Sequence, residues 1–199
     1  MNGLVYNLDM KNLLLLHGSY GDPNKNWYQY IGVKAQEKGY SVNIPRLPYI
    51  DKLDFDETFN FLFDQRFITN ETTVIGHSSG AAYILGILQR LPKDIIIQKA
   101  ILVAGFVDAD LTERLFQEVP KEHYYKLFPK KWNWEKIKTS CRKFVIVQSV
   151  NDPYIQMRHA KTLEEKLNGE LVILPGALHF SVNAGGKRFK EFPELLRYI

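Results

Sequence analysis

The feature that most constrains the fold is an alternation of short apolar runs with longer amphipathic stretches along the 199 residues. The runs are rich in β-branched residues and apolar on consecutive positions, as expected for strands covered on both faces. They lie at residues 12–16, 41–44, 72–75, 100–103, 144–147 and 171–174. Helical stretches follow at residues 27–38, 55–67, 81–91, 155–167 and 189–198. This alternation predicts an α/β protein, a three-layer α/β/α sandwich around a mostly parallel sheet of about six strands.

The chain length predicts one domain over residues 1–199, since domains typically hold roughly 100–200 residues. One segment, residues 108–140, breaks the alternation with prolines and many aromatic residues. We interpret it as an irregular helical excursion over the strand ends. Two interpretations stay open, because aromatic side chains line pockets as well as cores. The segment either forms a small cap on a pocket or closes the core at the edge of the sheet.

Cysteine and charge content exclude several classes of protein. The single cysteine, Cys141, excludes an internal disulfide framework and a cysteine-rich zinc site. Residues 1–9 show no signal peptide, and no run approaches the roughly 20 apolar residues of a membrane span. We therefore expect a cytoplasmic protein that needs no membrane. The net charge of +4 comes from 26 basic and 22 acidic residues that are interleaved, even in the densest basic stretch at 126–143. With no recognised binding motif, we expect no nucleic-acid partner.

The strongest local motif is Gly-His-Ser-Ser-Gly at residues 76–80, between an apolar strand and an apolar helix. Such a strand–turn–helix holds the central serine, Ser78, in a strained conformation that exposes its hydroxyl. The helix N-terminus behind it offers N–H groups to a developing oxyanion. The motif predicts a nucleophile, and the alternative is a serine in an ordinary glycine-rich turn.

A nucleophilic serine needs a base, and the base needs an orienting acid. Asp152 follows the strand at 144–147 and His179 follows the last strand, so both fall at the carboxyl edge of the sheet. The order Ser78, Asp152, His179 is that of α/β-hydrolases. Asp108 is a rival acid that we favour less, and Asp152 also suits a turn and helix cap. None of the other histidines follows the last strand, and the one at position 77 is more simply structural.

The first strand ends in a His-Gly turn that can aim a backbone N–H at the nucleophile. We predict that Ser19 and Ser79 supply the two N–H donors of an oxyanion hole. His17 is more simply a buried histidine that bonds to nearby loops. No metal-ligand spacing of histidines and no phosphate-binding glycine loop occurs, so we expect neither a metal nor a cofactor.

The whole chain resembles a known family through motifs that run from near its N-terminus to its last helix. They are Leu-His-Gly at 16–18, Asn-Ile-Pro at 43–45, Ile-Gly-His-Ser-Ser-Gly at 75–80, Ile-Leu-Val-Ala-Gly-Phe at 101–106, Trp-Glu-Lys-Ile at 134–137, Asn-Asp-Pro at 151–153 and Gly-Ala-Leu-His-Phe at 176–180. The set resembles the small single-domain serine hydrolases of the α/β-hydrolase superfamily, those similar to the bacterial YdeN proteins and retinoblastoma-binding protein 9. The resemblance implies a minimal α/β-hydrolase fold without a large lid. It also implies Ser78 as nucleophile, His179 as base and Asp152 as acid.

The leading hypothesis is a serine hydrolase that cleaves small acyl esters, with a small-molecule acyl substrate as its partner. A protein-interaction module on the same fold, and a thioesterase, peptidase or amidase using the same residues, are the alternatives. Family members often carry Asp or Asn where this chain has Arg46. A pocket-facing Arg46 would favour an anionic substrate, and we favour the simpler interpretation of a surface loop arginine.

Overall fold

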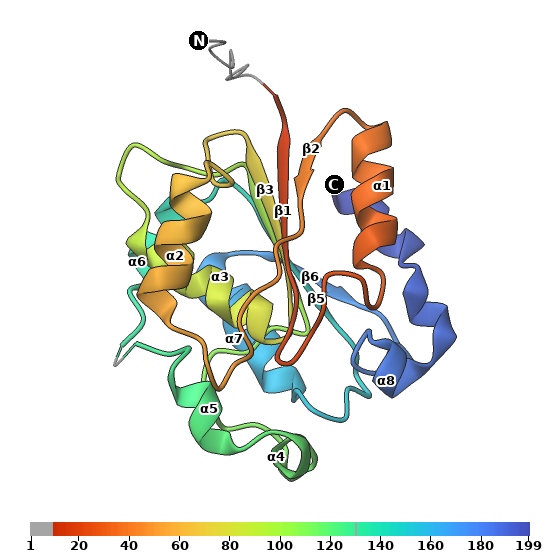
Figure 1. The fold of residues 1–199 in the computed structure, drawn as a ribbon. Coiled ribbons are helices and arrows are strands. Elements are labelled where there is room, and N and C mark those ends of the chain that lie inside the picture. The colour runs from red at the N-terminus through yellow and green to blue at the C-terminus, as the bar shows by residue number, and fades with distance from the viewer. Residues whose placement is uncertain (1–9, 130) are drawn as a thin grey trace.

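The computed structural model describes residues 10–129 and 131–199, and its centre is a six-stranded sheet (Figure 1). Residues 1–9, for which the sequence predicts no signal peptide, and Lys130 lie outside the described part. The strand order is β2-β1-β3-β4-β5-β6, and every neighbouring pair is parallel. The strands are β1 (Asn12–Leu16), β2 (Ser41–Asn43), β3 (Thr72–His77), β4 (Lys99–Val103), β5 (Phe144–Gln148) and β6 (Glu170–Ile173).

Helices connect the strands and cover the two faces of the sheet. The α-helices are α1 (Tyr28–Glu37), α2 (Phe55–Asp64), α3 (Ser79–Arg90), α4 (Glu113–Glu118), α5 (Lys121–Tyr125), α6 (Trp134–Thr139), α7 (Met157–Leu167) and α8 (Val182–Gly185). Two 3₁₀ helices, η1 (Lys187–Lys190) and η2 (Pro193–Tyr198), end the chain. The three-layer α/β/α arrangement predicted from the sequence is confirmed.

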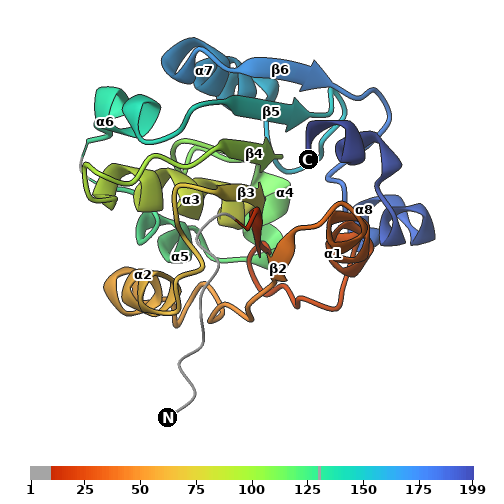
Figure 2. The same ribbon diagram turned by 90° about the horizontal axis from the view of Figure 1, so that it is seen from above.

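Successive residues of each strand point to opposite faces of the sheet, so their side chains pack in two separate hydrophobic cores. Leu14 and Leu16 of β1 pack with α2, α3 and α7, whereas Leu13 and Leu15 pack with α1 and the C-terminal 3₁₀ helices. Figure 2 shows α1 and α8 on one side of the sheet and α2, α3 and α7 on the other. All four leucines are fully buried. The central strands are therefore covered on both faces.

The two edge strands differ from the expectation of full burial. All three residues of β2 are half-buried, and Glu170 and Ile173 of β6 are exposed. An edge strand has only one neighbour, so helices cover it less completely. The apolar run at 171–174 reflects contact of its middle residues with the sheet and α7, not burial on both faces.

The helix predicted over residues 189–198 is wrong. Glu191 has an extended backbone and Phe192 a non-helical one (φ −148°, ψ 69°), and these two residues separate η1 from η2. Pro193, the first residue of η2, lacks the N–H that a continuous helix would need, and its ring disfavours a helical residue before it. The short helix α8 has no counterpart among the predicted elements. It begins at Ser181, whose hydroxyl accepts the backbone N–H of Ala184.

The structure places the two halves of residues 108–140 differently. Helices α4 and α5 lie beyond the carboxyl ends of the strands (Figure 1), and we call these two helices the cap. Trp132 and Trp134 instead pack on the core beside α3, and the indole N–H of Trp132 donates to the carbonyl of Val107 at 2.8 Å. The segment thus covers a pocket with its first half and closes the core with its second.

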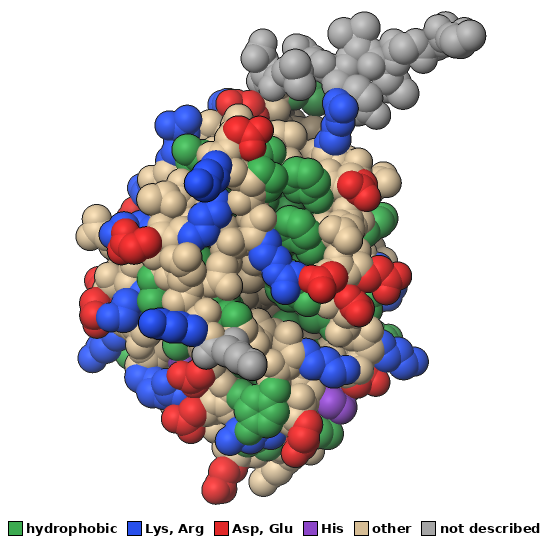
Figure 3. Space-filling view, turned by 90° about the vertical axis from the view of Figure 1, so that its left-hand side faces the viewer, with side chains coloured by type: hydrophobic (Ala, Val, Ile, Leu, Met, Phe, Trp, Pro, Cys, Tyr) green, Lys and Arg blue, Asp and Glu red, His purple; other side chains and the backbone are tan. Residues whose placement is uncertain are grey.

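Charged side chains of both signs are distributed over the surface around α2 and the cap. Figure 3 shows Lys and Arg side chains interspersed with Asp and Glu side chains there. Elsewhere on the surface, ion pairs with N–O distances of 2.7–2.9 Å include Lys34–Glu37, Arg46–Asp22, Lys143–Glu170 and Lys166–Glu165. Among the helices of residues 10–129 and 131–199, none combines the length and apolar character needed to cross a membrane.

Candidate active site

Ser78 lies at the sharp turn between β3 and α3, at the carboxyl edge of the sheet. Its backbone has φ 56° and ψ −122°, a region that residues with a side chain rarely adopt. Close packing fixes the turn: a Cβ on Gly76 would lie 2.6 Å from the nitrogen of Ala81, and one on Gly80 would lie 2.4 Å from the carbonyl oxygen of Leu16. Glycine is therefore required on both sides of Ser78, as the motif predicts.

His179 and Asp152 meet at the same edge of the sheet. The Nδ1–H of His179 donates to Oδ2 of Asp152 at 2.8 Å, since an ionised carboxylate can only accept. The Asp152 side chain is fully buried, and its Oδ1 accepts the backbone N–H groups of Tyr154 at 2.8 Å and Ile155 at 3.0 Å. These bonds fix the carboxylate and leave the lone pair of His179 on Nε2. An imidazole in this state can accept a proton from a hydroxyl group.

The loop that carries His179 is held by residues from the first third of the chain. The indole N–H of Trp27 donates to the carbonyl of Phe180 at 2.8 Å. The Nε2–H of His77 donates to the carbonyl of His179 at 2.9 Å, and the Tyr28 hydroxyl donates to Nδ1 of His77 at 2.7 Å. The structural role predicted for His77 is confirmed. Trp27 and Tyr28 had no local signal that pointed to this role, because their partners lie about 50–150 residues away in the sequence.

Burial keeps two histidines of this region neutral. Burial lowers the pKa of His77 to about 3, with a smaller contribution from the neighbouring His179. Burial also lowers the pKa of His17. His17 donates from Nδ1 to the carbonyl of Gly18 at 2.8 Å and accepts the N–H of Leu47 at Nε2 at 3.0 Å. The prediction that His17 is a buried, loop-bonding histidine is confirmed.

The loops that carry Asp152 and His179 are bonded to each other as well. The Ser149 hydroxyl accepts the N–H of Ala177 at 3.1 Å and donates to Oδ1 of Asn151 at 2.6 Å. That same amide oxygen accepts the N–H of Leu178 at 3.3 Å. Two polar side chains from the loop after β5 thus bind the backbone just before His179. They hold the two loops at the spacing that the His179–Asp152 bond requires.

Ser19 and Ser79, the two predicted oxyanion donors, lie together beside Ser78. Ser79 is the first residue of α3, so its N–H has no acceptor within the helix. The Ser19 hydroxyl donates to the Ser79 hydroxyl at 2.9 Å and joins the two loops. A Cβ on Gly18 would lie only 3.1 Å from the Cβ of Ser78. The loop after β1 therefore contacts the turn at Ser78, where two N–H groups could meet one oxygen.

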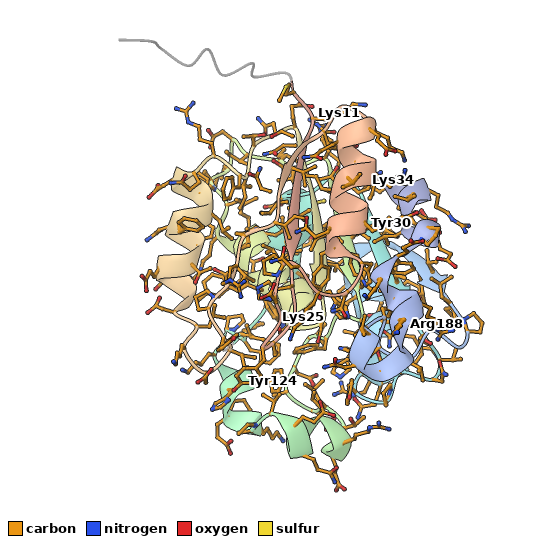
Figure 4. The ribbon with its side chains drawn as sticks, turned by 45° about the vertical axis from the view of Figure 1, so that its right-hand side comes forward. Lys11, Lys25, Tyr30, Lys34, Tyr124 and Arg188 are labelled. Carbon is orange, nitrogen blue, oxygen red and sulfur yellow. The ribbon has the colours of Figure 1, made fainter. Side chains whose placement is uncertain are left out.

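Ser78 and His179 line one hollow of about 130 Å³ at the carboxyl ends of the strands. The crevice lies beside β1. From β1 the chain goes to β2 on one side of the sheet and then to β3 on the other side, so the strand order reverses there. Ligands of parallel sheets usually bind at such a reversal, at the carboxyl ends of the strands. Figure 4 labels two lining residues, Lys25 of the loop before α1 and Tyr124 of α5. Polar and apolar surface contribute about equally to the lining. The full set is Gly18, Ser19, Tyr20, Gly21, Lys25, Asn26, Tyr28, His77, Ser78, Leu115, Glu118, Val119, Tyr124, Tyr154, His179, Ser181 and Asn183.

The cap contributes Leu115, Glu118, Val119 and Tyr124 to this lining, so part of residues 108–140 does cover the pocket. Arg46 is not among the lining residues. It is exposed and pairs with Asp22 at 2.7 Å, which confirms the interpretation as a surface arginine.

The rival groups have other partners. Both carboxylate oxygens of Asp108 accept from the guanidinium of Arg158, at 2.8 and 3.0 Å. His159 is buried beside the carbonyl of Asp110, and His123 bonds with the hydroxyl of Tyr20. Asp152, not Asp108, is the carboxylate bonded to His179. In the part of the chain that is described, no group of three or more His, Cys, Asp or Glu side chains is arranged to hold a metal ion.

Comparison with known proteins identifies a matching family and similar folds. The sequence model of a family described as serine hydrolase matches residues 13–198. Serine hydrolase RBBP9 of Rattus norvegicus is 26% identical over 185 residues, which are 92% of this chain and 85% of that protein.

Solved structures show the same fold. The ydeN gene product of B. subtilis superposes with a TM-score of 0.81 at 19% identity, covering 94% of this chain and 96% of that one. A carboxylesterase structure from Nitrososphaera gargenis gives a TM-score of 0.64 at 13% identity, covering 87% and 85%. The architecture is that of an α/β-hydrolase.

Proposed function

The chain belongs to the serine hydrolase family, and from this premise we propose that it cleaves small acyl esters through an acyl-enzyme on Ser78. One observation carries the proposal. The strained Ser78 turn lines the same hollow as His179, whose Nδ1–H is bonded to the buried Asp152. A serine in an ordinary glycine-rich turn would need neither the strain nor this pair.

The proposed reaction follows from the proton positions. Nε2 of His179 accepts the Ser78 proton as the hydroxyl oxygen attacks the ester carbonyl. Asp152 holds the ring and stabilises the imidazolium that forms. The backbone N–H groups of Ser19 and Ser79 donate to the oxyanion. The imidazolium then protonates the departing alcohol, and water hydrolyses the acyl-serine by the same route to release the acid.

Ester cleavage is the favoured reaction within this mechanism for two reasons. A solved structure that resembles this chain belongs to a carboxylesterase. The hollow is small and only lightly capped by α4 and α5, which suits short acyl groups. The substrate would then be a small-molecule acyl ester. The cytoplasmic location expected from the sequence stays a prediction.

A fluorophosphonate probe tests the nucleophile directly, because it phosphonylates an activated serine. We expect labelling of the wild type and none of Ser78→Ala. The control is Ser41→Ala, a half-buried serine of the edge strand β2 outside the hollow, which should label fully. Equal labelling of wild type and Ser78→Ala would refute the assignment.

Turnover of p-nitrophenyl esters of increasing chain length tests the substrate class. We expect the highest kcat/KM with short acyl chains, and loss of turnover in His179→Ala. Faster cleavage of thioesters or aminopeptidase substrates would reassign the reaction while keeping the residues. Absence of turnover on every acyl substrate would instead favour a protein-interaction module.

A further inference from the structure

Tyr154 joins three parts of the candidate site. Its backbone N–H donates to Oδ1 of Asp152 at 2.8 Å. Its ring meets the His179 ring edge to face, with centroids 5.0 Å apart and planes at 89°. Its hydroxyl donates to Oε1 of Glu118 on α4 at 2.8 Å. The side chain is buried and lines the hollow.

The contact with His179 restricts a motion that Asp152 alone permits. A single hydrogen bond at Nδ1 leaves the imidazole free to rock about that bond. The ring of His77 lies 5.0 Å from the His179 ring at an angle of 44°, and Tyr154 supplies the other aromatic neighbour. Nε2 then stays where it can meet the serine hydroxyl. Such placement matters, because a shift of about 1 Å at a reacting group can cost about 100-fold in rate.

The contact with Glu118 fixes the cap. Thr112, the N-cap residue of α4, donates its hydroxyl to the carbonyl of Pro153 at 2.9 Å and its N–H to the carbonyl of Tyr154 at 3.3 Å. These bonds hold the start of α4 on the loop that carries Asp152. The bond from Tyr154 to Glu118 holds the other end of the same helix. Because α4 lines the hollow with Leu115 and Glu118, its position sets the width available to substrate.

We propose that Tyr154 is a positioning residue that couples the cap to the base, with its ring holding the His179 imidazole and its hydroxyl holding α4 over the pocket. The proposal rests on the proposed function, since it assigns His179 as the base. The proposal assigns the ring and the hydroxyl group of Tyr154 to different effects. Loss of the ring should lower kcat, whereas loss of the hydroxyl alone should raise KM.

The kinetic test compares Tyr154→Leu with Tyr154→Phe on a short p-nitrophenyl ester. We expect Tyr154→Leu to lower kcat about tenfold or more, and Tyr154→Phe to change kcat less than twofold while raising KM about three- to tenfold. Glu118→Leu, which removes the acceptor of this hydrogen bond, should raise KM similarly, and the double variant should add little to either single change. Tyr125→Phe and Tyr125→Leu are the matched controls, because Tyr125 is an exposed tyrosine of the same cap.

A second readout is independent of turnover. A proton bonded between imidazole and carboxylate gives a separate downfield NMR signal. We expect the His179 Nδ1–H signal in wild type and in Tyr154→Phe, and its loss through fast exchange in Tyr154→Leu. A wild type without ester turnover would refute the proposed function but leave this test of Tyr154 intact.

Tyr154→Met, with its flexible side chain, replaces the Leu variant if that one does not fold. The proposal is overturned if a folded Leu or Met variant keeps both the wild-type kcat and the downfield signal. It is also overturned if Tyr154→Phe and Glu118→Leu leave KM unchanged or act additively.

Discussion

Acid should destabilise this protein through His77, and the size of the effect follows from its surroundings. His77 is buried with a pKa of about 3, whereas an unfolded histidine titrates near 6.5. Between these values the unfolded chain binds the extra proton and the folded chain does not. Stability therefore falls as the pH drops below about 6.5. From pH 8 to pH 5 the loss is about 2 kcal/mol for this one group.

The assay is urea unfolding followed by tryptophan fluorescence at pH 8, 7, 6 and 5. The comparison variant is His77→Gln, whose amide N–H can replace the Nε2–H donor to the carbonyl of His179 but does not titrate. We expect this variant to be less stable throughout, yet to lose about 2 kcal/mol less than wild type between pH 8 and pH 5. In melting temperature the difference is about 4–8 °C for a chain of this size.

A matched variant without a titrating side chain separates this effect from general acid sensitivity. Ser41→Ala, at a half-buried residue of β2, should show the same acid loss as wild type. The reasoning fails if wild type and His77→Gln lose equal stability between pH 8 and pH 5. The lowered pKa of the buried His17 acts in the same direction, so part of the acid loss should survive in His77→Gln.

Three further substitutions test the site from other directions. Asp152→Asn should keep the fold but lower kcat about 10⁴-fold, because the amide favours the wrong histidine tautomer. Turnover of p-nitrophenyl esters measures this change. A loss of kcat below tenfold would contradict the prediction. Tyr28→Phe leaves Nδ1 of His77 buried without a donor and should cost about 1–3 kcal/mol in urea unfolding, whereas Tyr30→Phe, at a half-buried neighbour, should cost almost nothing. Gly80→Ala places a Cβ 2.4 Å from the carbonyl oxygen of Leu16 and should abolish fluorophosphonate labelling, and full labelling would show that the turn can shift.

The parts of the structure set by nearby residues could be predicted from the sequence. The apolar runs gave the number of strands, and the glycines around Ser78 gave the turn, because a close backbone approach excludes any larger residue. Chain order and the carboxyl-edge rule placed Asp152 and His179 on one rim, and the structure joins them by a 2.8 Å bond.

The parts that depend on distant residues could not be predicted. Trp27 and Tyr28 look like ordinary core aromatics of a helix start, and only the fold brings them to the His179 loop. The position of Tyr154 is similar, since its hydroxyl partner lies on the cap 36 residues earlier. Pro193 is a local signal for the break between η1 and η2, because proline disfavours a continuous helix. The periodicity of apolar residues alone does not reveal it.

The anchoring of the His179 loop by Trp27 and Tyr28 has a consequence for how the site is made on the ribosome. Trp27 and Tyr28, the turn at Ser78 and the central strands are all synthesised before the last fifth of the chain. His179 and the final helices that complete its packing emerge last. A nascent chain can therefore form most of the sheet with Ser78 in place before His179, the proposed base, has been made. If the proposed function holds, Ser78 gains its proposed base only after the sheet that positions both residues has been made.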